Sequence, residues 1–263
     1  MTLAILAASS KPFEVPPAGK LFNYEPLFKI GSLNVTFPTV VMFGVTVLLG
    51  VFFWRAFAKP KLVPVGAQNL GEAGVDFVRA QIVNPVLGPE GAAWLPFLTI
   101  VFFWVLMNNI MGIIPGIQLP ITSLMAYPAM LAIIAWLIYN GIGIKEQGLF
   151  GYFKNMMFPP GIPLGIKPIL ALIEFVSTVL VRPLTLAVRL FANMVAGHMI
   201  LGVLFIGTGV FLHGNIIGKV GVIAPFGLGI IMTFFELFVA AMQAFIITIL
   251  TAVYIAGAKE AHH

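Results

Sequence analysis

Two stretches of the chain, residues 31–54 and 91–144, contain no charged residue. A helix that crosses the hydrocarbon core of a bilayer needs about 20 predominantly apolar residues, so the first stretch allows one crossing and the second allows two. The composition agrees, because 60% of the 263 residues are hydrophobic and 9% are charged. An ordinary soluble domain has roughly 25% charged residues. We therefore expect an all-α membrane protein that forms a single integral membrane domain.

The apolar stretches predict about five spanning helices. A basic flank that starts at Arg55 ends the first, and a turn rich in proline and glycine around Pro115 separates the second from the third. A polar, proline-rich loop follows, and two longer apolar stretches come after it. The expected spans are 37–54, 92–114, 121–144, 168–209 and 226–257, after an external N-terminal segment at 1–36.

A short amphipathic helix is expected at 66–86, between the first and second spans. Asn69, with Glu72 three residues later, resembles a helix N-cap and its capping-box partner. Apolar side chains such as Leu70 and Phe77 lie opposite charged ones on this helix. We expect the helix to lie on the inner membrane surface. The alternative is a solvated connector helix, because few apolar residues form its face.

The basic residues orient this topology. With the N-terminus outside, eight Lys or Arg residues are cytoplasmic and four are external, as the positive-inside rule prefers. The cytoplasmic set is Arg55, Lys59, Lys61, Arg79, Lys145, Lys154, Lys167 and Lys259, and the external set is Lys11, Lys20, Lys29 and Lys219. The C-terminus is then cytoplasmic, and Arg182 and Arg189 remain within the membrane.

The last two apolar stretches are too long for upright spans. At about 1.5 Å per residue they would reach roughly 60 Å and nearly 50 Å, against a hydrocarbon core of about 30 Å. A mean tilt of about 20° cannot absorb this excess, so we expect a steeply inclined helical hairpin. If the hairpin turns near Ile216, His198 lies level with Glu236. Arg189 then lies level with Gln243.

Arg189 is the most informative ionisable residue. A charge at the centre of a spanning helix costs about 2.5–3.5 kcal/mol on insertion scales, so such residues tend to be paired and functional. No carboxylate of the chain lies level with Arg189 in the predicted hairpin, so its counter-charge is expected elsewhere. Arg182 is ambiguous, because it can pair with Glu174 or lie near the interface. Ionisable groups buried in this way point to ion movement within the bilayer.

A second polar group lies at another level of the hairpin. A buried imidazole beside a carboxylate can accept and release protons near neutral pH, so His198 and Glu236 suit a proton relay. A static pair is the structural alternative. At 100° per residue, Asn193 shares the face of Arg189, whereas His198 lies on the opposite face. Asn193 and Gln243 carry less information, because amides commonly join helices in membranes.

Several function classes find no support in the sequence. The chain has no cysteine, which removes disulfides, thiolate catalysis and thiolate metal sites. We recognise no catalytic nucleophile, metal cluster or phosphate-binding loop, and we expect neither an enzyme nor a bound cofactor or metal. The net charge of +5 does not predict nucleic-acid binding, because the basic residues lie at span ends rather than between aromatic platforms.

The segment 182–198, RPLTLAVRLFANMVAGH, closely resembles the signature of subunit a of the F-type ATP synthases. Glu236, followed by Met-Gln-Ala-Phe at 242–245, resembles the last helix of that family. Two such motifs at this spacing are not a generic membrane pattern. The resemblance extends over the whole chain, and five spans with an inclined hairpin also fit the family.

The resemblance implies an ion-translocating stator subunit of a rotary ATP synthase in the bacterial plasma membrane, with two offset proton half-channels. Arg189 would face the carboxylates of the c-ring and separate the half-channels, with His198 and Glu236 at the inlet. Glu174 would lie toward the cytoplasmic exit. The implied partners are the c-ring, the b subunits of the peripheral stalk and membrane lipid, with protons as the transported ion. The implied proton-translocation residues are Arg189, His198, Glu236, Asn193, Gln243, Glu174, Ser177 and Arg182.

The alternative function is that of a proton-coupled secondary transporter. Such a protein would bind a solute at the midplane, between repeated halves with broken helices, and we recognise no such repeat. A membrane scaffold is a third class, and it would tolerate substitution of Arg189.

Overall fold

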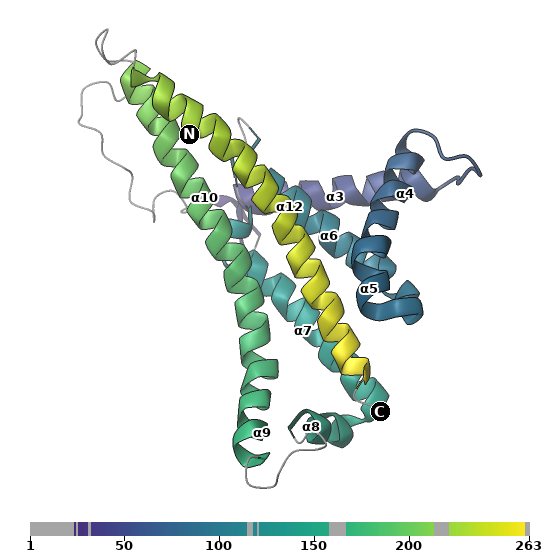
Figure 1. Cartoon of the computed structure of the whole chain (residues 1–263). Helices are drawn as coiled ribbons and strands as arrows, with labels where there is room; N and C mark the ends of the chain where they lie inside the picture. Colours follow the sequence, from purple (N-terminus) through teal and green to yellow (C-terminus); the bar gives the residue numbers. More distant parts are fainter. Residues whose placement is uncertain are drawn as a thin grey trace. The chain divides into compact units, whose positions relative to one another are not determined.

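The computed structural model is helical over most of the chain that it describes (Figure 1). The described residues are 24, 26–30, 33–114, 118–119, 121–157, 167–212 and 221–260. Most of the expected external segment lies outside these residues, as do Pro115 and the expected hairpin turn at Ile216.

Nine α-helices and four short helical turns make up the helical part of the described residues. The α-helices are α3 (Phe37–Phe57), α4 (Ala67–Val78), α5 (Asn84–Leu87), α6 (Leu95–Ile110), α7 (Ala126–Gln147), α8 (Leu149–Met157), α9 (Lys167–Val176), α10 (Arg182–Leu212) and α12 (Ile223–Glu260). The turns are η1 (Arg79–Val83) and η4 (Ser177–Val181), which are π-helical, and η2 (Gly88–Ala93) and η3 (Ile121–Ser123), which are 3-10 helices.

Four described helices are long and apolar enough to cross a membrane: Phe37–Phe57, Ala126–Gln147, Pro168–Leu212 and Ile223–Lys259. The remaining expected span, at 92–114, corresponds to α6, a shorter apolar helix of 16 residues. These helices confirm the predicted all-α membrane fold. In α3 only 17% of the most apolar window is buried, so its apolar side chains form a surface suited to hydrocarbon rather than to water.

Several helix ends differ from the expected span limits for local reasons. The second span begins at Leu95 rather than at 92, because residues 88–93 form the 3-10 turn η2. Gly88 starts that turn with φ 60°, a left-handed conformation that glycine adopts without a Cβ clash. The third begins at Ala126 rather than at 121, because η3 precedes it.

A two-stranded antiparallel hairpin precedes α3, and the sequence pattern did not predict it. Strand β1 (Pro26–Ile30) pairs with β2 (Leu33–Thr36), with Phe28 opposite Val35 and Lys29 opposite Asn34. The strands have 5 and 4 residues, too few for alternation of polar and apolar side chains to stand out.

The expected amphipathic helix at 66–86 is built from α4, the π-turn η1 and α5. The expected capping box is absent, because α4 begins at Ala67 and Asn69 lies inside it. Glu72 accepts a hydrogen bond from Gln68 Nε2 (2.7 Å), which also donates to the Lys61 carbonyl (2.9 Å). Gln68 therefore binds the Glu72 carboxylate that the capping box would have used. It also joins the start of α4 to the preceding loop through the Lys61 carbonyl.

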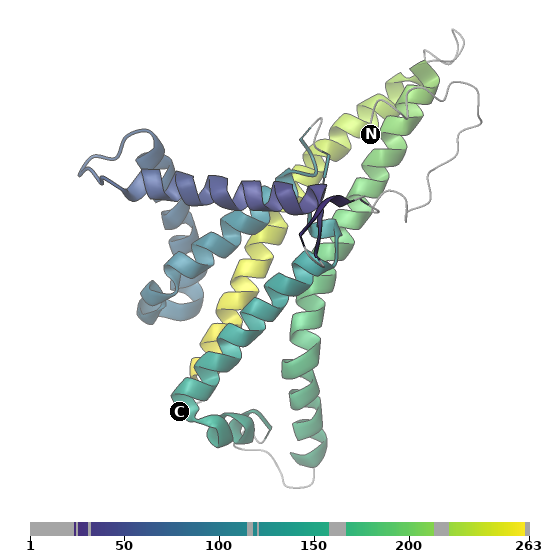
Figure 2. The same cartoon turned by 180° about the vertical axis from the view of Figure 1, so that it is seen from behind.

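The chain divides into two compact units, which are described separately. Unit 1 comprises 1–45, 106–124 and 191–242, and unit 2 comprises 46–105, 125–190 and 243–263. Within unit 1, α10 and α12 run side by side in both views (Figures 1 and 2), and the Gly229 backbone lies against the Phe205 ring. The last two long helices thus contact each other, as predicted for a hairpin. Their inclination to the membrane stays a prediction.

Each unit has its own buried centre. In unit 1, Thr122 Oγ1 donates to Asn109 Oδ1 (2.6 Å), and both residues are fully buried. This bond joins α6 to the 3-10 turn η3. In unit 2, the core cluster comprises Tyr139 and Ile142 of α7 with Ile255 and Ala258 of α12.

Replacing Gly143 by alanine should destabilise the packing of α8 on α7. A Cβ at 143 would collide with the Tyr152 ring, whose hydroxyl donates to Asn140 Oδ1 (2.8 Å) and so holds the ring in place. We expect a loss of about 1–3 kcal/mol, the usual cost of overpacking, seen as a lower Tm of the purified full-length chain in detergent.

Gly141→Ala is the matched control for Gly143→Ala. Gly141 lies on the same helix, and a Cβ there would meet nothing within 4 Å. Alanine is the better helix former, so this variant should keep or raise the Tm. Equal Tm values for the two variants would contradict the packing described.

Candidate functional site

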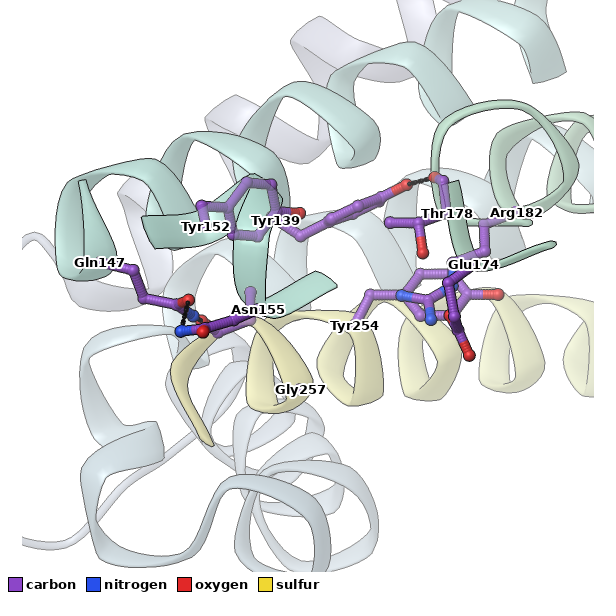
Figure 3. A pocket seen from close by; sticks show the side chains of 10 residues that line it. Tyr139, Gln147, Tyr152, Asn155, Glu174, Thr178, Arg182, Tyr254 and Gly257 are labelled. Atoms are coloured by element: carbon purple, nitrogen blue, oxygen red, sulfur yellow. Dashed lines mark hydrogen bonds between the residues drawn. The ribbon is translucent and has the colours of Figure 1, made fainter. Parts of the chain in front are cut away.

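A cavity of about 250 Å³ in unit 2 opens beside the start of α10 (Figure 3). Its wall is formed by side chains and backbone from α7, α8, α9, η4, α10 and α12. These residues are Tyr139, Gln147, Tyr152, Asn155, Glu174, Thr178, Arg182, Tyr254, Gly257 and Ala258. Two of the predicted site residues, Glu174 and Arg182, therefore share one cavity, with polar groups from distant parts of the sequence around them.

The π-turn η4 lies between Glu174 and Arg182 and separates α9 from α10. A π-turn widens the helical hydrogen-bond ladder and disturbs the bonding of its carbonyls. The Tyr139 hydroxyl donates to the Thr178 carbonyl (2.8 Å) within this turn, and both residues are buried (Figure 3). Tyr139 thus satisfies a buried carbonyl of the turn that sets the direction of Glu174 relative to α10.

Arg182 contacts an aromatic ring, and not the carboxylate that was one of its two predicted alternatives. Its Cζ lies 5.2 Å from the centroid of the Tyr254 ring, which is cation-π geometry. Glu174 is half-buried on the wall of the same cavity, and Ser177 is half-buried in η4. No ion pair joins Glu174 to Arg182 in the part of the chain that the structure describes. The proposed structural pair between them is therefore not formed.

Arg189 lies on α10 with its side chain exposed. Gln243 Nε2 donates to the Arg189 backbone carbonyl (3.2 Å), and Gln243 is buried. The two residues are thus level, as the hairpin arithmetic predicted, but the amide holds the backbone and leaves the guanidinium outside. Among the described residues, no carboxylate lies within ion-pair distance of Arg189. Asn193, four residues later on the helix, is also exposed.

Glu236 is buried in unit 1, where it packs directly against the Gly197 backbone of α10. A Cβ at position 197 would overlap the Glu236 carboxylate, so glycine allows the carboxylate its present position. His198, the next residue on α10, is half-buried. The Glu236 carboxylate of α12 therefore lies beside Gly197, the residue before His198.

Two polar contacts fix the C-terminal end of α12 next to the cavity of unit 2. Gln147 Nε2 donates to the Ala258 carbonyl (3.1 Å), and Lys259 Nζ forms an ion pair with Glu90 Oε2 (2.9 Å). The hydrogen bond and the charge of Lys259 lower the pKa of Glu90, which lies in η2 outside the spans. The pair is solvent-exposed on the Glu90 side, so it positions the helix end more than it stabilises the fold.

Sequence reasoning missed the tyrosines of this cavity. Tyr139 and Tyr254 lie in apolar spans, where an aromatic ring is usually part of the packing. A buried tyrosine hydroxyl needs a hydrogen-bond partner, and this requirement could have indicated a polar site near these tyrosines. Among the described residues, no group of three or more His, Cys, Asp or Glu side chains could hold a metal ion.

Removing the Tyr139 hydroxyl should loosen the π-turn. In Tyr139→Phe the Thr178 carbonyl would stay buried without its donor, a loss of about 1–3 kcal/mol. Faster amide hydrogen exchange over 177–182 and a lower Tm of the full-length chain should report it. Tyr254→Phe removes a hydroxyl from the same cavity but keeps the ring beside Arg182, so exchange in that variant should stay unchanged. Equal exchange in both variants would refute the role of Tyr139.

Comparison with known proteins covers almost the whole chain. The sequence profile of the family described as ATP synthase A chain matches residues 39–256. The chain is 44% identical over 244 residues to ATP synthase subunit a of Parafrankia sp. (strain EAN1pec), covering 89% of this chain and 80% of that protein. It is 44% identical over 249 residues to the subunit a of Frankia alni, covering 92% and 85%.

A third relative extends the match to nearly every residue. ATP synthase subunit a of Rhodococcus erythropolis is 38% identical over 266 aligned residues, covering 99% of this chain and 95% of that protein. The profile and the relatives agree with the resemblance carried by the segment 182–198 and by Glu236. The chain belongs to the ATP synthase A chain family, the family of ATP synthase subunit a.

Proposed function

We propose that this chain is the stator subunit through which protons reach and leave the c-ring of a rotary ATP synthase, by two offset half-channels that Arg189 separates. As a member of the subunit a family it is a non-catalytic membrane subunit, and nucleotide chemistry belongs to other subunits. The proposal assigns separate tasks to three places: the exposed Arg189, the buried Glu236 with His198, and the cavity that contains Glu174.

The observation that carries the proposal is the exposed guanidinium of Arg189 on an apolar helix. An arginine in a membrane span raises the free energy of insertion unless a counter-charge lies beside it. Within the described part of the chain no carboxylate lies within ion-pair distance of Arg189, and Gln243 bonds only to its backbone. A carboxylate on a partner, the c-ring, would supply the missing charge.

Arg189 would act as a fixed charge rather than as a proton carrier. A guanidinium stays protonated in proteins, so it cannot accept and release a proton. It can attract an ionised ring carboxylate, and it can repel a proton that would pass directly from one half-channel to the other. The exposed Asn193 would add a polar group on the same helix face.

Glu236 and His198 would receive protons on the external side. Both side chains titrate, and both lie on the two longest helices. Because Glu236 packs against Gly197, its carboxylate is held beside α10 rather than directed into lipid. This arrangement suits a relay that passes a proton from an external funnel toward the ring, and the imidazole favours protons over sodium ions.

The cavity beside α10 suits the cytoplasmic exit. Glu174 offers a titratable carboxylate, and the hydroxyls of Thr178 and the surrounding tyrosines can hold water. Arg182 keeps a positive charge on the wall, beside the Tyr254 ring. With the N-terminus outside, as the distribution of basic residues favours, this exit would face the cytoplasm of a bacterial cell.

Arg189→Ala should reduce ATP-driven proton pumping by the assembled complex in membrane vesicles to background, with passive proton leakage retained or increased. The neutral side chain would no longer attract the ring carboxylate or block passage between the half-channels. Fluorescence quenching of a pH-sensitive dye measures both quantities. Arg79→Ala makes the same substitution at an exposed ion pair of the α4–η1 region and should leave pumping intact. Coupled pumping by Arg189→Ala would sink the proposal.

Gly197→Ala and Glu236→Gln should both slow proton conduction. The new Cβ would displace the Glu236 carboxylate, which is the movable end of its side chain, so conduction should fall while the complex still assembles. Passive conduction through membranes stripped of the catalytic sector would be measured. Gly202→Ala lies on the same helix with nothing within 4 Å of its Cβ, and it should conduct normally. Unchanged conduction by both Glu236→Gln and Gly197→Ala would favour a static structural pair.

A further inference from the structure

A second cavity, of about 540 Å³, lies in unit 2 among α3, α4 and α6. Its wall includes Leu49, Phe53 and Phe57 of α3, Val75 of α4, and Phe103 and Trp104 of α6. We call it the apolar groove. The wall positions on α3 run from Thr46 to Phe57 along one stripe, which at 1.5 Å per residue is about 16 Å long. The groove is therefore an elongated space rather than a compact pocket.

The wall of the groove offers almost nothing to a polar ligand. Trp104 Nε1 donates to Thr46 Oγ1 (3.1 Å), so these two polar groups satisfy each other. Thr99 provides one further hydroxyl, which is buried and has no hydrogen-bond partner in the described part of the chain. The Phe53 and Phe103 rings meet edge to face, with centroids 5.6 Å apart. A hydrocarbon chain is the chemical class that fits such a wall.

Basic side chains gather where the α3 wall of the groove ends. Lys59 and Lys61 follow Phe57, the last wall residue of α3, whereas Arg55 lies in the last turn of α3 on the face opposite the wall. All three are exposed, and none forms an ion pair within the described residues. The nearby acidic residues of α4 are engaged otherwise: Glu72 binds Gln68, and Asp76 pairs with Arg79. The cluster therefore keeps its positive charge.

The segment after this cluster is apolar and exposed. Leu62 is 104% exposed, Val63 74% and Val65 59%, directly after Lys61. Large apolar side chains next to lysines are typical of segments that lie in a membrane interface. The end of α3 thus combines positive charge, interfacial apolar residues and an apolar groove leading away from them.

We propose that this corner is a binding site for an anionic phospholipid, with its phosphate against Lys59 and Lys61 and one acyl chain in the apolar groove. The charge of the cluster selects the headgroup, and the aromatic wall accommodates the hydrocarbon. The site is separate from the proton path, because none of its residues has a role in the proposed half-channels.

The test uses the assembled complex in membranes supplied with phosphatidylglycerol that carries a photoreactive acyl chain. Illumination should crosslink this lipid to peptides of α3 and α6. Phosphatidylcholine with the same acyl chain should label them less. In the double variant Lys59→Gln, Lys61→Gln, the preference for the anionic lipid should fall about fivefold for each charge removed. Equal labelling by both lipids in the unaltered chain would overturn the proposal.

Filling the groove tests the acyl-chain part of the site. Gly50 lies on the wall, and a Cβ there would meet nothing within 4 Å, so Gly50→Leu should occupy the groove without a clash. Gly44→Leu is the matched control on the same helix, outside the wall and also in open space. We expect labelling to be lost in Gly50→Leu alone, with equal amounts of complex.

The contrary outcomes of the groove test are equally definite. Equal labelling of the Gly50→Leu and Gly44→Leu variants would refute occupation of the groove. Crosslinks from a neighbouring protein chain to α3 and α6, in place of lipid, would show that another subunit covers the site and would also refute it. If Gly50→Leu failed to assemble, the loss of lipid preference in the charge variant would still decide the question.

Discussion

The cost of placing charge in hydrocarbon is the constraint on which the rest of this structure depends. Water does not solvate a guanidinium inside a bilayer, so each arginine of a span needs a partner or a polar channel. Arg182 and Arg189 lie in one helix, yet among the described residues an aromatic ring lies against Arg182 alone. The guanidinium of Arg182 therefore lies against the Tyr254 ring of the same chain, whereas the side chain of Arg189 is exposed.

The close approach of the two long helices makes this arrangement possible. Gly197 of α10 leaves space for the Glu236 carboxylate in its present position. On α12, the residues Ala240 and Ala244 are small and fully buried. Small residues let helix backbones approach closely where no hydrophobic effect drives them together. The same closeness allows the Gln243 amide to reach the Arg189 carbonyl. Packing and polar chemistry therefore depend on the same residues.

The spanning helices could be predicted from the sequence because an uncharged apolar stretch of sufficient length has few alternatives in a bilayer. The levels of Arg189 and Gln243 followed from an assumed turn near Ile216 and an equal helix rise on both sides of it. The expectations that failed depended on side-chain contacts that the local patterns did not include. The capping box lost Glu72 to Gln68, four residues earlier, and a carbonyl of the π-turn η4 accepts from Tyr139, 39 residues away. No local pattern encodes such a donor.

The π-turn also explains why helical angles could be used for Arg189 but not for Glu174. Arg182, Arg189 and Asn193 all lie within α10, where 100° per residue holds. Glu174 lies before η4, whose wider turn breaks that periodicity. A regular helix from 168 to 209 would place Glu174 on a different face relative to Arg182. The irregular turn, bonded to Tyr139, instead brings both residues to the wall of one cavity without pairing them.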